Sequence, residues 1–172
     1  MKKLIKVSFI VTFILSAFTA SAQMDKSKRP SPPDTVRATT SKGVAIEVAY
    51  SQPSVKGRTI GTDIATYGKV WRTGANEATT IQFSKDVKVE GKALPAGKYA
   101  IYTIPGEKEW TIMFNKGVKN WGTVYKEEDD AARVTVKTQK ASSFTEKLTF
   151  KVDASGKVSF AWGDKMAAFV VK

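Results

Sequence analysis

The stretch "VAIEVAY", residues 44–50, decides the fold class because its large apolar side chains recur at every second position. Val44, Ile46, Val48 and Tyr50 fall on one face of an extended chain, and a glutamate and two alanines fall on the other. A period of two is the pattern of a half-buried β-strand. The stretch "TVRATT" precedes it across "SKG", whose Gly43 suits a hairpin turn. An antiparallel strand pair is therefore predicted here.

Alternating or β-branched runs continue to the end of the chain, separated by turn sequences such as "EGK", "PAG", "DASGK" and "GDK". The runs cover residues 78–83, 87–89, 98–104, 110–115, 133–138, 147–152, 157–162 and 166–171. Residues 61–67 are the one stretch that could form a short helical turn. About ten strands at this spacing predict an all-β domain over residues 34–172, a single antiparallel β-sandwich or a closely related barrel with little helix.

The first 22 residues have the order of a secretory signal peptide, with three lysines, an apolar run and the small residues Ala20, Ser21 and Ala22. The apolar run is shorter than the roughly 20 residues that a membrane-spanning helix needs. We therefore expect cleavage before Gln23, export to the periplasm or the medium, and no transmembrane segment in the mature chain. Residues 23–33 are polar and proline-rich, which predicts a flexible leader.

The composition excludes several classes of site. The chain has no Cys and no His, so disulfides, Ser-His-Asp and Cys-His nucleophiles and the commonest zinc sites are excluded. "DASGK" lacks the successive oxygen ligands of a calcium loop, and "EEDD" is more simply a solvated face. We expect neither a metal nor another cofactor. The net charge is +12, but the lysines are dispersed singly, so nucleic acid is not expected as a partner. The oligomeric state is left open.

The stretch "YGKVWRTGANEATT", residues 67–80, has two interpretations. As a binding site, Trp71 provides a stacking wall, Arg72 a planar donor for an anion, and Asn76 and Glu77 orient hydroxyl groups. As a structural fastener, Arg72 pairs with Glu77, Asn76 caps its own backbone, and Trp71 packs in the core. The fastener is favoured because structural ion-pair networks are common. Gly74 and Asn76 are the loop residues best able to adopt positive φ.

Two further residues, Arg58 and Trp121, complete the set of candidate ligand-binding residues. No catalytic residue is predicted. Arg58, in the loop "QPSVKGR", would form a basic pocket with Arg72 if both loops reach the same rim. Trp121 is a candidate for an exposed platform on which a sugar could stack. Trp110 and Trp162 share alternating faces with other apolar residues and are predicted to lie in the core. The full candidate set is Arg58, Trp71, Arg72, Asn76, Glu77 and Trp121.

Four stretches resemble an exported bacterial family, the domain of unknown function 2911. They are "YSQPSVKGRTIG" at residues 50–61, "YGKVWRTGANEATTIQFSKDVKVEGKALPAGKYAIYTIPG" at 67–106, "EWTIMFNK" at 109–116, and "WG" at 121–122. The resemblance covers nearly the whole mature chain from about Ser31. It implies an exported β-rich domain and supplies neither an activity nor catalytic residues.

Three functional hypotheses follow. The leading one is a non-enzymatic binding or accessory module of the cell envelope, whose expected ligand is an envelope glycan or another anionic or polyhydroxyl molecule. The first alternative is a glycan hydrolase that uses a carboxylate pair drawn from Asp63, Glu77 and Glu47. The second is a structural envelope subunit, which would expose an apolar patch or an unpaired edge strand.

Overall fold

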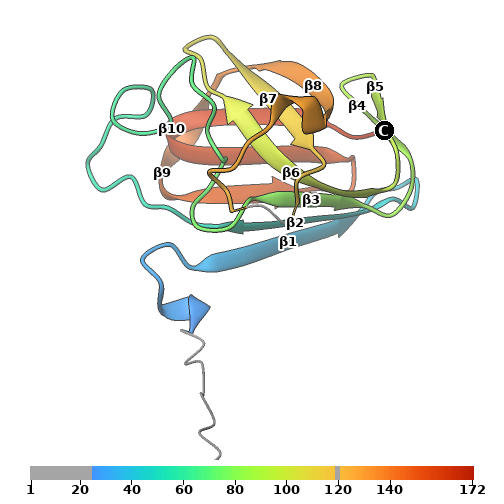
Figure 1. Ribbon diagram of the computed structural model, residues 1–172, viewed down its shortest axis with the longest axis horizontal. Helices are drawn as coiled ribbons and strands as arrows, with labels where there is room; N and C mark the ends of the chain where they lie inside the picture. Colours follow the sequence, from blue (N-terminus) through green and yellow to red (C-terminus); the bar gives the residue numbers. More distant parts are fainter. Residues whose placement is uncertain (1–24, 119–120) are drawn as a thin grey trace, which may run out of the picture.

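The computed structural model describes residues 25–118 and 121–172 (Figure 1). The predicted signal peptide, residues 1–22, and the first two residues of the leader lie outside this part of the chain. Within it, neither of the two helical turns is long and apolar enough to span a membrane.

The described residues form ten strands and two short 3-10 turns. The strands are β1 (Pro33–Thr39), β2 (Ala45–Ser51), β3 (Thr80–Phe83), β4 (Val87–Val89), β5 (Lys92–Leu94), β6 (Gly97–Ile104), β7 (Glu109–Asn115), β8 (Asp130–Lys137), β9 (Gln139–Val152) and β10 (Lys157–Val170). The turns are η1 (Lys26–Lys28) and η2 (Glu127–Asp129). The prediction of an all-β chain is confirmed.

Six strands make the first layer, in the order β1-β2-β3-β6-β7-β8, with every neighbouring pair antiparallel. The long β9 and β10 form a hairpin that belongs to the second layer (Figure 1). The β4–β5 hairpin pairs with the end of the chain, just after β10, in this second layer. The backbones of Lys88 and Lys172 exchange hydrogen bonds of 2.7 and 2.9 Å. On the other side, Ser54 forms a bridge with Lys147 of β9. The arrangement is the predicted antiparallel sandwich.

The core lies between the layers and follows from the alternation along each strand. In β2, Ile46 and Val48 are 1% and 0% exposed, whereas Glu47 between them faces outward. Aromatic rings join the two layers: Phe114 of β7 meets Phe169 of β10 edge-on, with centroids 5.5 Å apart. Trp110 and Trp162 are both buried, as predicted from their alternating faces.

Three local predictions were wrong. The "GDK" stretch is not a turn, because Gly163 adopts a φ of +58° and carries the strand through a shift of register, so the two predicted strands merge into β10. β9 begins at Gln139 rather than residue 147, and β5 was not predicted. Residues 61–67 form turns and a bridge between Ile60 and Ile64 instead of a helical turn.

The outer face of the six-stranded layer is divided into a covered and an open half. Tyr102 and Met113 point outward yet are 1% and 0% exposed, because Tyr125 from the segment between β7 and β8 packs against them. The half over β1, β2 and β3 stays open and holds a hollow of about 430 Å³. The candidate site lies at the covered half.

Candidate functional site

The segment that follows Val70 enters the sandwich along the edge of β6. Trp71 exchanges backbone hydrogen bonds of 2.7 and 2.8 Å with Thr103, so it continues the sheet beyond β3. Its ring stacks on Trp162, with centroids 5.2 Å apart and planes 6° apart, and meets Trp110 edge-on. Trp71 therefore packs against the core, as the fastener interpretation predicts, but it also lines the cavity described below. Its contact with a ligand remains a prediction.

Glu77 is held by the leader rather than by its own loop. The Arg29 guanidinium donates two hydrogen bonds, of 3.0 and 2.9 Å, to the two carboxylate oxygens, and Lys26 Nζ lies 2.9 Å from Oε1. The predicted pairing of Glu77 with Arg72 was therefore wrong. Lys26, the backbone N–H of Glu77 and Arg29 lower the pKa of this carboxyl to about 2, because each favours its charged form.

Asn76 fastens the same loop to the chain that leads into β1. It adopts a φ of +59°, as predicted, and its Nδ2 donates to the carbonyl of Ser31 at 3.0 Å rather than capping its own backbone. Within residues 73–78, the second residue with a positive φ is Thr73, and not Gly74 as predicted. Gly74 is nevertheless required, because a Cβ there would lie 2.5 Å from Thr79 Oγ1. This part of the loop is a fastener.

Arg72 has a different environment and lines a cavity of about 350 Å³. The cavity residues are Val70, Trp71, Arg72, Tyr102, Gly122, Thr123 and Tyr125. Arg72 makes no hydrogen bond or ion pair with any other described residue, while the nearby carboxylate of Glu77 is engaged by Lys26 and Arg29. Gly122 lets the Arg72 side chain lie close to its backbone, because a Cβ at Gly122 would lie 2.8 Å from Arg72 Cδ. We call this hollow the Arg72 cavity.

Two tyrosines make one wall of the Arg72 cavity. Tyr102 Oη donates to the carbonyl of Val124 at 2.9 Å, and the rings of Tyr102 and Tyr125 lie 4.9 Å apart. Tyr125 Oη donates to Asp130 Oδ2 at 2.7 Å. Burial, followed by the hydrogen bond and the charge of Asp130, raises the pKa of Tyr125 to about 12, so the phenol remains a donor at neutral pH.

Asp130 organises this wall, and the sequence analysis missed it. Its side chain is 7% exposed and accepts hydrogen bonds from Asn115 Nδ2 at 2.8 Å and Arg133 Nε at 2.7 Å. The interpretation of "EEDD" as a solvated face holds for Glu127 and Glu128, which are exposed, but not for Asp130. The register of β7 and β8 places Asp130 opposite Asn115, and this pairing is not visible in the sequence.

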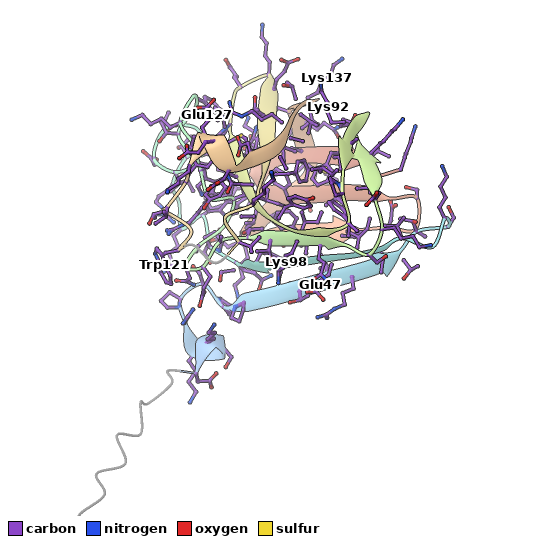
Figure 2. The ribbon with its side chains drawn as sticks, turned by 45° about the vertical axis from the view of Figure 1, so that its right-hand side comes forward. Glu47, Lys92, Lys98, Trp121, Glu127 and Lys137 are labelled. Atoms are coloured by element: carbon purple, nitrogen blue, oxygen red, sulfur yellow. The ribbon has the colours of Figure 1, made fainter. Side chains whose placement is uncertain are left out.

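The two remaining candidates lie outside the cavity lining. Arg58 donates from Nε to the Val55 carbonyl at 3.0 Å and from Nη2 to the Ser54 carbonyl at 2.8 Å, so it holds its own loop. Trp121 is 52% exposed, as a stacking platform requires (Figure 2). Its backbone forms a bridge with Glu77. It directly precedes Gly122 of the Arg72 cavity. A contact of either side chain with a ligand remains a prediction.

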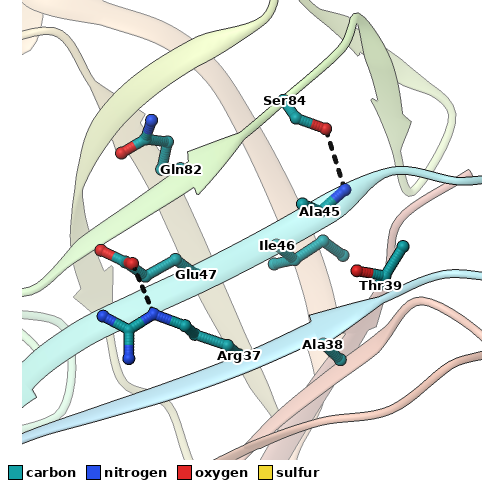
Figure 3. Close-up of a pocket in the computed structure, with 8 residues that line it drawn as sticks. All are labelled: Arg37, Ala38, Thr39, Ala45, Ile46, Glu47, Gln82 and Ser84. Carbon is teal, nitrogen blue, oxygen red and sulfur yellow. Dashed lines mark hydrogen bonds and ion pairs between the residues drawn. The ribbon is translucent and has the colours of Figure 1, made fainter.

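The three candidate catalytic acids occupy separate places. Glu47 accepts a 2.8 Å hydrogen bond from Arg37 and lines the open hollow over β1, β2 and β3 (Figure 3). Asp63 Oδ2 accepts from the backbone N–H of Thr59 at 2.8 Å. Glu77 shares a hollow of about 170 Å³ with Asp34, a carboxylate that the sequence analysis did not consider. Among the described residues, no three Asp or Glu side chains are grouped as metal ligands.

Comparison with known proteins identifies one family. The family model described as "Protein of unknown function (DUF2911)" matches residues 31–171. No curated protein and no solved structure matches the chain. The matched residues include all ten strands, so the match covers both layers and the Arg72 cavity.

Proposed function

The chain belongs to this family of unknown function, and we propose that it is an exported, non-enzymatic binding module of the cell envelope. Its ligand, an anionic molecule with hydroxyl groups, is held in the Arg72 cavity. The observation that carries the proposal is the guanidinium of Arg72, which lines a cavity without an acidic partner among the described residues. The order of basic, apolar and small residues in the first 22 positions supports export.

The chemistry of the Arg72 cavity suits an acidic sugar or a similar ligand. A guanidinium offers a planar pair of donors that matches a carboxylate or sulfate. Tyr102 and Tyr125 supply an apolar wall whose hydroxyl groups are already fixed by Val124 and Asp130. A wall that is fixed in advance costs little entropy when a ligand binds.

The open hollow in Figure 3 is a weaker candidate, although it is larger. Its arginine, Arg37, already donates to Glu47 on the neighbouring strand. An anion that bound there would have to compete with this carboxylate. Arg72 faces no such competition from a described residue, so the smaller cavity has the more available cation.

Hydrolysis is less well supported than binding. Asp34 and Glu77 line one hollow, as a carboxylate pair would. A glycosidase needs one carboxyl that is protonated at working pH. Lys26 and Arg29 instead hold the pKa of Glu77 near 2, so Glu77 is not suited to act as the general acid. Asp34 is already engaged by hydrogen bonds from Tyr50 Oη and Gln52 Nε2.

The proposal is tested by titrating ¹⁵N-labelled protein with glucuronate and N-acetylmuramate, with glucose as the uncharged control. We expect the acidic sugars to shift the amide signals of Gly122 and Thr123, and glucose to leave them in place. Arg72→Lys should weaken binding at least about tenfold, because a lysine cannot donate in the bidentate geometry. The matched control is Arg58→Lys, whose guanidinium holds its own loop. Equal losses in both variants, or no shifts at all, would reject the proposal.

A structural subunit is the second candidate, and one observation favours it. Val70, Trp121 and Val124 are 44%, 52% and 45% exposed, and all three lie in or beside the segments that line the Arg72 cavity. Light scattering of the wild type and of Trp121→Ser separates the candidates. A dimer that dissociates on this substitution would make the patch a subunit interface, whereas a monomer in both cases supports ligand binding.

A further inference from the structure

A second groove lies on the β9–β10 hairpin, in the layer opposite to the Arg72 cavity. One hollow of about 170 Å³ is lined by Ala141, Ser142, Ser143, Thr145, Thr149, Lys151, Ser159, Ala161 and Met166. A second, of about 480 Å³, extends from the hairpin to β1. Lys151 and Ser159 line both hollows, so the two are adjacent. We call the combined feature the hairpin groove.

The wall of the hairpin groove follows from an unequal strand pairing. Thr145 lies opposite Gly163, and Lys140 lies opposite Lys165. Two positions along β10 therefore correspond to five along β9, and the extra residues of β9 must bulge away from the ladder. Gly163 adopts the positive φ that this bend requires. The bulged residues include Ser142 and Ser143, which border the groove.

The lining holds five hydroxyl groups, and three of them have no hydrogen-bond partner among the described residues. The hydroxyls of Ser142, Ser143 and Ser159 make no hydrogen bond with other described residues, whereas that of Thr149 donates to the carbonyl of Lys147. Ser159 lies directly opposite Lys151 in the strand register. A row of free hydroxyls beside an ammonium group offers donors and acceptors to a polyhydroxyl ligand.

The charge of the groove is positive. Lys151 and Lys157 line it and form no ion pair within the described residues, while Arg37 at its far end is paired with Glu47. The one acid in the lining, Asp153, is occupied by its own turn, where Oδ1 accepts from the backbone N–H groups of Ser155 at 2.9 Å and Lys157 at 3.2 Å. Lys151 and Lys157 form no ion pair with a described residue and can meet anionic groups of a ligand, although Asp153 interacts electrostatically with Lys157.

We propose that the hairpin groove binds a linear acidic polysaccharide. Two adjacent hollows suit an extended chain, the free hydroxyls suit its sugar rings, and the two lysines suit its carboxylates or sulfates. Single-stranded nucleic acid would need aromatic platforms, but the one aromatic residue in the lining, Phe150, is 1% exposed. Phe144 is 64% exposed but lies between two lining residues without lining the groove itself.

The test measures binding to polygalacturonate by isothermal titration calorimetry at low and physiological ionic strength. We expect Lys151→Gln combined with Lys157→Gln to weaken binding at least about tenfold and to reduce its dependence on salt, because two charge contacts are lost. The matched control is Lys98→Gln combined with Lys137→Gln, two exposed lysines of the six-stranded layer, which should change the affinity less than about twofold. Urea unfolding checks that all variants remain folded.

A second pair of variants tests the hydroxyl groups. Ser143→Ala and Ser159→Ala should each weaken binding about threefold without changing the salt dependence, since an uncharged hydrogen bond is lost. In the Arg72→Gln background, the two lysine substitutions should still weaken polygalacturonate binding at least about tenfold, which separates this proposal from the Arg72 cavity. Three results would overturn it: no binding by the folded wild type, an equal loss in the lysine control, or tighter binding of duplex DNA or phosphatidylglycerol vesicles at the same ionic strength.

Discussion

Glu77 and Asp130 are both carboxylates that tie a connecting segment to the sandwich, but they do so in different surroundings. Glu77 is 42% exposed and is held by two cations of the leader, Lys26 and Arg29. Asp130 is 7% exposed and accepts from Asn115, Tyr125 and Arg133. Water competes for the first carboxylate and is largely excluded from the second. From this comparison we expect burial, rather than the number of charged partners, to decide which carboxylate contributes more to stability.

The largest effect is expected from Asp130→Ala. This change removes the acceptor of the Tyr125 hydroxyl and one of the two acceptors of the Asn115 amide, which also donates to the Lys126 carbonyl. The place is largely buried, so the loss costs about 2 kcal/mol of unfolding free energy. Urea unfolding measures it, and Glu128→Ala, an exposed neighbour with no side-chain hydrogen bond to a described residue, should stay within about 0.5 kcal/mol of the wild type. A cost below about 1 kcal/mol for Asp130→Ala would mean that the buried contacts of Asp130 stabilise the fold no more than the exposed ion pairs of Glu77 do.

A smaller effect is expected from Glu77→Gln. At pH 7 the cost should not exceed about 1 kcal/mol, because the ion pairs are partly exposed and screened. The pKa of Glu77 is lowered from 4.5 to about 2 in the folded protein, so its contribution is fully present above about pH 4.5 and is lost as the pH falls toward 2. Urea unfolding of both proteins between pH 7 and pH 2 should therefore show curves that converge at the acid end. A difference that persists at pH 2 would contradict this account.

The smallest effect on stability is expected from Arg72→Ala, which should lie within about 0.5 kcal/mol of zero. Arg72 is not paired with Glu77, so the double variant with Glu77→Gln should show additive changes within about 0.5 kcal/mol. A coupling energy above about 1 kcal/mol in this cycle would mean that the two side chains do pair in solution. Additive changes would show that Glu77 and Arg72 act independently, with Glu77 tied to the leader and Arg72 unpaired among the described residues.

The strands with alternating apolar residues were predictable from the sequence, and the others were not. β2 buries Ile46, Val48 and Tyr50 at every second position, and alternating or β-branched runs also identified β6 and β7. These two strands bury consecutive residues, because the segment that holds Tyr125 covers part of their outer face. The first half of β9, "QKASSF", has no such alternation, because it bulges away from β10 and its residues border a groove. Its assignment as a strand depends on pairing with a partner that the local sequence does not specify.

The candidate site was predictable in its residue types but not in its pairings. Arg72 and Glu77 carry opposite charges five positions apart, and this proximity predicted an ion pair that the structure does not contain. Strand alternation turns Arg72 to the outer face, and Glu77 meets Arg29, which is 48 positions away in the sequence. The Tyr102 and Tyr125 wall depends in turn on a segment that crosses the outer face of the sheet.

By itself, the sequence determined the class of fold, the core-facing positions of strands that alternate, such as β2, and the kinds of side chain near Trp71. These features depend on local periodicity and on the free energy of burying apolar side chains, which are properties of each short stretch. Only the tertiary structure decided that Glu77 binds the leader, that Asp130 is buried and that Arg72 remains available. Each of these depends on which distant segments meet when the two layers close, and the chain order does not encode such distances locally.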